Sequence, residues 1–211
     1  GRPVGVVEAD LRAHAYAAPF KVAANPPFNL TAEILRRLLV EGPHPDACAL
    51  ALQREAAQSW AGTPRPTARS LSVQPWFELE VIHAFSRQDF VPAPGVDVSL
   101  LRVVRRAEPL LPHAQQGLWR GFLAYAFARQ APDARRMLRN VLSNLQWRRL
   151  SHDLAIPPGA ARGDLTLIQW VALFRFVLAH TPEHRRPFGR DQRGLNTNSS
   201  LSPSGSAKKT A

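Results

Sequence analysis

Four consecutive residues, Asn25-Pro26-Pro27-Phe28, carry the groups needed to hold a flat heterocyclic amine. The Asn25 side-chain oxygen and the Pro26 carbonyl can each accept one hydrogen of such an amine, and proline fixes the direction of the carbonyl. The Phe28 ring can stack on a base turned out of its helix. The tetrapeptide therefore suits chemistry at the exocyclic amine of a nucleobase. Its purely structural alternative is a rigid strand-to-helix turn, because proline and asparagine are ordinary turn residues.

Methyl transfer from S-adenosylmethionine is the reaction that fits these groups. A base amine is a poor nucleophile because its lone pair is delocalised into the ring, whereas the sulfonium donor is already activated. Neither a covalent nucleophile nor a metal is then needed, and catalysis depends on positioning and in-line approach. The π face of Phe28 suits the positive charge that develops on the nitrogen.

Two further segments carry candidate site residues. Residues 4–7 (Val-Gly-Val-Val) indicate the end of a buried strand, so Asp10 would follow it and accept a hydrogen bond from the cofactor's adenine amine, with Leu11 against the ring. The alternative for Asp10 is a solvated loop acid. Phe90, in a proline-flanked segment, is a candidate second stacking surface or else a core aromatic.

The charge distribution points to a polyanionic partner. The chain has 27 Lys+Arg and 16 Asp+Glu, a net charge of +11, and residues 101–211 hold 18 of the basic and only 6 of the acidic residues. Such asymmetry favours nucleic acid, although a merely soluble basic surface is the alternative. The candidate phosphate contacts, each otherwise a solvated surface charge, are Arg65, Arg69, Arg102, Arg105 and Arg106.

Several classes of protein are excluded or disfavoured. The single cysteine, Cys48, rules out a disulfide scaffold and a cysteine-built zinc site, and its apolar neighbours favour a core position. His180 and His184 have Pro182 between them and no third ligand, so we expect no metal. We find neither an apolar run long enough to span a membrane nor a secretory signal, and therefore expect a cytoplasmic protein.

The elements that would position these residues alternate between strand and helix, which predicts an α/β sheet. Strands are predicted at 20–24, 47–52, 77–85 and 96–104. A helix capped by Asn29 should end at Gly42-Pro43, and residues 62–69 should form a loop. Since open α/β sheets bind ligands at the carboxyl ends of their strands, Asn25–Phe28 lies where a site is expected.

After Pro109 the pattern becomes helical. Helices are predicted at 113–130, from Asp133 along the apolar stripe Met137 to Leu145, and at 165–179 with Asp164 as its cap. From Thr181 onward the composition is basic and polar, which predicts a disordered tail.

These residues together resemble the Erm family of 23S rRNA adenine-N6 methyltransferases, which are related to the KsgA-type small-subunit rRNA dimethyltransferases. The similarity runs from about Val6 to Ala179. It rests on Val-Val-Glu-Ala-Asp (6–10), Phe-Lys-Val-Ala-Ala-Asn-Pro-Pro-Phe (20–28), Leu-Gln-Arg-Glu-Ala-Ala (52–57), Pro-Trp-Phe-Glu-Leu (75–79) and Asp-Phe-Val-Pro-Ala-Pro-Gly-Val-Asp (89–97). The Pro-Pro form and the high arginine content resemble actinobacterial members.

The resemblance implies a Rossmann-like methyltransferase domain at 1–108, a small all-α rRNA-binding domain at 109–180 and a tail at 181–211. It implies mono- or dimethylation of one adenine in the peptidyl-transferase loop of 23S rRNA, unassembled or partly assembled, by a monomer. S-adenosylmethionine is the implied donor, and resistance to macrolides, lincosamides and streptogramin B is the implied outcome. In the family pattern Asp10 holds the cofactor adenine, while Asn25–Phe28 and Phe90 face the target base.

One departure from the family pattern is large. Members begin with a Glu/Asp-x-Gly-x-Gly-x-Gly loop after the first strand, then an acidic residue for the cofactor ribose, and these 211 residues contain neither. We therefore expect an N-terminally truncated member. The alternatives are another amino-methyltransferase, acting on small-subunit rRNA, DNA adenine or protein glutamine, and a non-catalytic rRNA-binding fragment.

Overall fold

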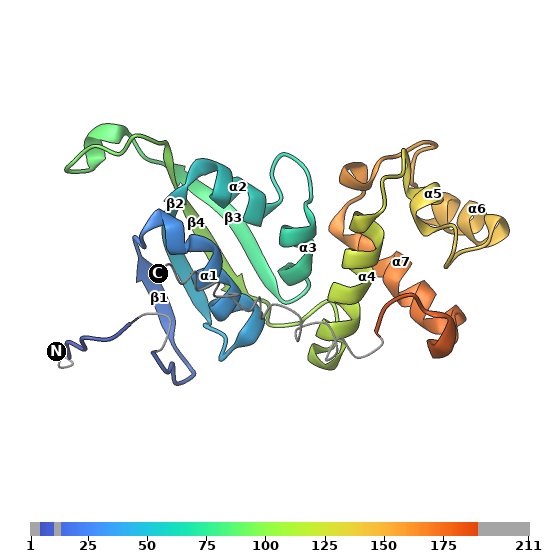
Figure 1. Cartoon of the computed structure of the whole chain (residues 1–211), viewed down its shortest axis with the longest axis horizontal. Coiled ribbons are helices and arrows are strands. Elements are labelled where there is room, and N and C mark those ends of the chain that lie inside the picture. The colour runs from blue at the N-terminus through green and yellow to red at the C-terminus, as the bar shows by residue number, and fades with distance from the viewer. Residues whose placement is uncertain (1–4, 11–13, 190–211) are drawn as a thin grey trace, which may run out of the picture.

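The structure is a computed structural model that describes residues 5–10 and 14–189. Its centre is a four-stranded sheet in the order β1-β2-β4-β3 (Figure 1). The strands are β1 Lys21–Ala24, β2 Ala47–Gln53, β3 Phe77–Ala84 and β4 Val98–Arg105. β1 is parallel to β2, and β4 is antiparallel to both β2 and β3. All four strands agree with the predicted ones to within two residues.

The register places the ends of the strands that matter for the site together. Gln53, the last residue of β2, pairs with Val98, the first residue of β4, and Ala84 at the end of β3 pairs with Ser99. The parallel strand β1 ends at Ala24 beside Leu50. We call this side the carboxyl end of the sheet, because β1, β2 and β3 all finish there.

Short helices follow the strands in this half. They are η1 Phe28–Leu30, α1 Thr31–Arg36, η2 Arg37–Glu41, α2 Arg54–Ala61, α3 Ala68–Val73 and η3 Arg87–Asp89. Gly42 ends the first helical run with φ +74°, as the Gly-Pro signal predicts. Asn29 is not its cap, because a 3-10 turn begins at Phe28 and Leu30 takes the cap position. Arg69 lies in α3 and not in the predicted loop.

The second half is helical and packs beside the sheet half (Figure 1). Its elements are η4 His113–Gln115, α4 Gln116–Ala128, α5 Ala134–Leu138, α6 Asn144–Asp153, η5 Arg162–Asp164, α7 Leu167–His180 and η6 Glu183–Arg185. One hydrophobic core runs through both halves, from Leu35 under the sheet to Trp170 in α7. None of the described helices is long and apolar enough to cross a membrane.

Two helix predictions are wrong in detail. The apolar stripe from Met137 to Leu145 is divided between α5 and α6, because Ser143 starts a new helix with a capping box to Gln146. α7 is capped by Thr166, whose hydroxyl accepts from the Gln169 N–H, and not by Asp164. The Asp164 carboxylate instead accepts from the N–H of Ala161 in the preceding turn.

The predicted buried strand ending near Val7 is also wrong for its described residues. Residues 5–10 have no regular structure, and Val6 and Val7 are 96% and 72% exposed. A strand exists only through hydrogen bonds to a neighbour, and no described strand pairs with this apolar segment.

The predicted disorder from Thr181 is wrong for residues 181–189. Phe188 is only 7% exposed, and its ring lies 5.4 Å from that of Phe122 and 6.3 Å from that of Tyr125. The polar composition hides one aromatic side chain that is part of the core. Residues 190–211 lie outside the described part of the chain.

Candidate active site

The tetrapeptide Asn25–Phe28 directly follows β1 at the carboxyl end of the sheet. Pro26 is buried and Phe28 half-buried, whereas Asn25 and Pro27 are exposed. The Pro27 carbonyl accepts from the N–H of Leu30 at 2.9 Å and so starts the following turn. The two prolines have no N–H of their own, so they add no backbone donor that the turn would have to satisfy.

The acceptors that the predicted chemistry requires are the ones this turn does not use. Neither the Asn25 side chain nor the Pro26 carbonyl forms a hydrogen bond with another described residue. Both oxygens thus keep their hydrogen-bonding capacity, and Asn25 is exposed, with Phe28 two residues after Pro26 in the sequence. The backbone does form the strand-to-helix turn of the structural alternative, but that turn does not use these two oxygens.

Phe90 lies in the long connection between β3 and β4, residues 85–97, which we call the arm. The arm leaves the carboxyl end of the sheet and projects away from the body (Figure 1). Phe90 is half-buried, and its ring meets that of Phe85 edge-on at 5.4 Å. The topology thus brings Phe90 to the same end of the sheet as Asn25, from a position 65 residues further along the chain.

Asp97 anchors the arm, a role that was not predicted, although this residue ends the 89–97 motif. Its carboxylate lies 2.8 Å from the Arg54 guanidinium at the start of α2 and 3.2 Å from that of Arg87 in the arm. The Arg54 N–H also donates to the Asp97 carbonyl at 2.8 Å. One carboxylate therefore ties the base of the arm to the end of β2. In the sequence the two residues stand as an arginine directly after one strand and an aspartate just before another, and nothing there links them as a pair.

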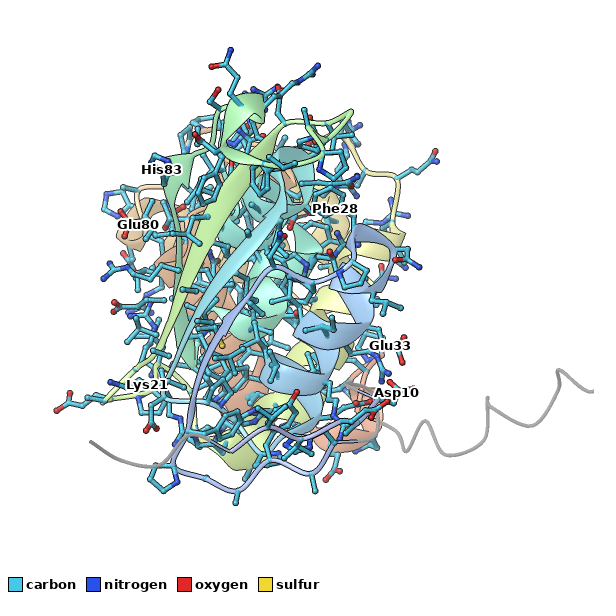
Figure 2. All side chains as sticks on the ribbon, turned by 90° about the vertical axis from the view of Figure 1, so that its left-hand side faces the viewer. Asp10, Lys21, Phe28, Glu33, Glu80 and His83 are labelled. Carbon is cyan, nitrogen blue, oxygen red and sulfur yellow. The ribbon has the colours of Figure 1, made fainter. Side chains whose placement is uncertain are left out.

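Asp10 is not brought to the tetrapeptide. Figure 2 shows Asp10 toward the end of the sheet where β1 begins at Lys21, and Phe28 toward the opposite end. The Asp10 carbonyl accepts from the N–H of His14 at 2.9 Å, and Leu11 lies outside the described residues. The predicted grouping of Asp10, Leu11 and Asn25 around S-adenosylmethionine therefore stays a prediction, and we derive no step through the cofactor.

Two of the predicted phosphate-binding arginines pair across the sheet. Arg102 on β4 lies 2.7 Å from Glu80, its register partner on β3. Arg106 lies 2.8 Å from Glu78 and also donates to the Gln74 carbonyl. Ion pairs of this kind reduce the positive charge available to a phosphate.

The other three predicted arginines also have partners within the chain. These contacts are Arg65 with Asp164 at 3.3 Å, Arg69 over the Trp60 ring at 5.6 Å, and Arg105 with Asp46 at 3.6 Å. Phosphate binding by the set of five stays a prediction, and their geometry favours structural roles.

The chain is similar to several curated proteins along most of its length. An rRNA adenine N-6-methyltransferase of Bacillus licheniformis is 24% identical over 178 residues, which is 84% of this chain and 62% of the relative. The ribosomal RNA small subunit methyltransferase A of Nostoc punctiforme is 34% identical over 75% of this chain and 58% of its own. The mycinamicin-resistance protein MyrB of Micromonospora griseorubida is 27% identical over 82% of this chain and 55% of its own.

The fold is that of a solved methyltransferase. The crystal structure of the 23S rRNA methyltransferase ErmE matches with a TM-score of 0.73 and 25% identity, over 81% of this chain and 70% of that one. The predicted α/β, Rossmann-like methyltransferase fold is thereby confirmed. The chain spans about three fifths of the length of the curated relatives it matches. Residues 6–177 match the family described as ribosomal RNA adenine dimethylase, and the chain belongs to that family.

Proposed function

We propose that this protein methylates the N6 amine of a specific adenine in the peptidyl-transferase loop of 23S rRNA, once or twice, with S-adenosylmethionine as donor. The observation that carries the proposal is the pair of unused acceptors, the Asn25 side chain and the Pro26 carbonyl, beside the half-buried Phe28. The likeness to ErmE and to MyrB supports the choice of 23S rRNA and resistance to macrolides, lincosamides and streptogramin B as the outcome.

The chain's own residues would act on the acceptor base. Asn25 and the Pro26 carbonyl hold the two amine hydrogens, which turns the nitrogen lone pair out of conjugation with the ring. Phe28 stacks on the flipped adenine, and Phe90 on the arm covers its other face. S-adenosylmethionine supplies an activated methyl group when bound. The contribution of these residues is therefore position and orientation, with no covalent intermediate on the protein.

The same proposal assigns roles to the two halves. Residues 1–108 would act as the catalytic domain and residues 109–180 as an rRNA-binding domain, in a cytoplasmic monomer that meets 23S rRNA before the large subunit is complete. The joined core does not conflict with this division, because rigidly packed domains can still have different ligands.

Two other functions have specific support. Small-subunit rRNA is a candidate substrate because the Nostoc punctiforme small-subunit enzyme is 34% identical to this chain, more than the Bacillus licheniformis relative. A non-catalytic rRNA-binding role is favoured by the separation of Asp10 from Phe28.

A labelling assay distinguishes these functions. The protein encoded by the longest reading frame that contains these residues is incubated with radiolabelled S-adenosylmethionine and naked 23S rRNA, 16S rRNA or duplex DNA. Label on 23S rRNA, mapped to one adenine of the peptidyl-transferase loop, supports the proposal. Label on 16S rRNA or DNA alone overturns it, and binding of 23S rRNA without any label indicates the non-catalytic role.

A further inference from the structure

A cationic hollow lies where α4 gives way to α5, away from the base-binding end of the sheet. Its volume is about 340 Å³, and its lining consists of Arg129, Gln130, Ala131, Pro132, Arg136 and Arg139. The local sequence explains its shape. α4 ends as Arg129 turns to an extended conformation, and Pro132 leads into Asp133, whose side chain caps α5. Arg136 lies in α5, and Arg139 directly follows the helix in a helical conformation three residues later, so the two side chains project from the same side.

The arginines of this hollow have fewer acidic partners than the five arginines that the sequence analysis predicts as phosphate contacts. Arg129 and Arg139 form no ion pair with any residue in 5–10 or 14–189. Arg136 approaches the Asp133 carboxylate only to 3.9 Å, and that carboxylate is already the helix cap, accepting from the Arg136 N–H at 2.7 Å. Of the three guanidinium groups, only that of Arg136 lies near a carboxylate of the described residues, and this carboxylate already caps α5.

Tyr125 on α4 helps to hold this arrangement. The Arg129 guanidinium carbon lies 5.0 Å from the centre of the Tyr125 ring, a cation–π contact. Burial raises the pKa of the Tyr125 phenol, while the positive charges of Arg129 and Arg139 act in the opposite direction. The charges of both guanidinium groups therefore act on the pKa of this phenol. The phenol oxygen is itself buried and has no hydrogen-bond partner among the described residues.

We propose that this hollow binds a phosphate group of the RNA backbone, with Arg129 and Arg139 as its main ligands and Arg136 as a third. Guanidinium forks match the geometry of phosphate oxygens and remain charged at any physiological pH. The lining offers no aromatic face for a base, so the site should position RNA without reading its sequence. That the RNA is ribosomal rests on the proposed function; the phosphate site itself does not.

The test measures RNA affinity apart from methyl transfer. The whole protein and its Arg129→Ala and Arg139→Ala variants are titrated with a hairpin copied from the peptidyl-transferase loop and with polyuridine, at several salt concentrations. Arg185→Ala is the matched control, because Arg185 is exposed and lies outside the hollow. Asp133→Asn keeps a good helix cap and removes the one negative charge, so it should strengthen binding.

Each hollow variant should weaken binding to both RNAs alike. Each variant should also reduce the steepness of the plot of log affinity against log salt concentration by roughly 0.7 to 0.9. Between about 50 and 200 mM salt, the variant should then lose about threefold less affinity than the wild type does. An unchanged slope in both variants, or an equal effect of Arg185→Ala, overturns the site. If these shifts occur in a protein that methylates no RNA, the hollow stands and the proposed function fails. If 23S rRNA is methylated while the slopes stay unchanged, the proposed function stands and the phosphate site fails.

Discussion

The indole N–H of Trp119 on α4 donates a buried hydrogen bond of 2.7 Å to the carbonyl of Leu71 in α3. This bond satisfies a group that α3 cannot satisfy itself. The partner expected within a continued helix would be the N–H four residues later, but that residue is Pro75, which has none. One side chain of the helical half therefore completes the last turn of a helix in the sheet half.

Trp119→Phe should destabilise the protein more than its loss of volume suggests. The Leu71 carbonyl would be left buried and unpaired, at a cost of about 1–3 kcal/mol. The matched control is Trp170→Phe, because Trp170 is equally buried yet its N–H has no partner among the described residues. Urea unfolding of both variants measures the difference. An equal loss of stability in the two would show that the Trp119 hydrogen bond contributes nothing.

Asp97→Ala should loosen the arm without unfolding the protein. The two ion pairs of Asp97 are partly exposed, so the free energy of unfolding should change by no more than about 1 kcal/mol. The arm would lose its ion pair with the Arg54 side chain and keep only the backbone hydrogen bond there, so protease cleavage within residues 85–97 should become faster. Methyl transfer should fall as Phe90 loses its fixed position.

Glu80→Ala is the control for the Asp97 variant. It breaks the similarly exposed Arg102–Glu80 pair, which crosses the sheet and does not touch the arm. Proteolysis of the arm should then stay at the wild-type rate. Equal cleavage rates in all three proteins would mean that Asp97 does not anchor the arm.

Phe28→Leu should separate catalysis from RNA binding. Loss of stacking on the flipped adenine is worth about 1–3 kcal/mol, or roughly a 5- to 150-fold fall in methyl transfer. Phe28→Tyr keeps the ring and should retain most activity. Bulk RNA affinity, measured by filter binding, should not change in either variant because the phosphate contacts lie elsewhere. Full activity of the leucine variant would identify Phe28 as a packing residue only.

Local signals in the sequence were enough for the part of the site that lies in one turn. Asn25–Phe28 combines a strand end, two prolines and a helix start, and each of these is read within a few residues. Gly42-Pro43 marks a helix end with equal clarity. The positions of the four strands followed from apolar runs bounded by such breakers, whereas their order in the sheet was not predicted.

The features that were not predicted depend on contacts between segments that lie far apart in the sequence. Asp97 and Arg54 are 43 residues apart, and nothing near either residue indicates the other. Residues 4–7 have the apolar composition of a strand, but pairing requires a neighbour, and no described strand pairs with the described residues of this segment. Phe188 lies in a polar stretch whose composition does not indicate its ring contacts with Phe122 and Tyr125 of α4.

Phe188→Ala should show that the residues after α7 belong to the core. Removing a buried ring that packs on Phe122 and Tyr125 should lower the free energy of unfolding by about 3 kcal/mol. Phe188→Leu should cost much less because it keeps most of the volume. Thermal unfolding followed by circular dichroism measures both. If the alanine variant has the melting temperature of the wild type, residues 181–189 do not belong to the core and the original prediction of a disordered tail holds.

Cys48 should be chemically silent in the folded protein. Burial in β2, at 3% exposure, raises the pKa of its thiol to about 12. The folded pKa lies above the unfolded value of about 8.5, so the protonated thiol favours folding. That contribution is complete below the unfolded pKa and is lost as the pH rises toward 12.

Because the thiolate is the nucleophile, iodoacetamide at mildly alkaline pH should modify Cys48 only at the rate of unfolding. The Cys48→Ala variant should lose less stability than the wild type over this alkaline range, and rapid labelling without denaturant would contradict the buried position.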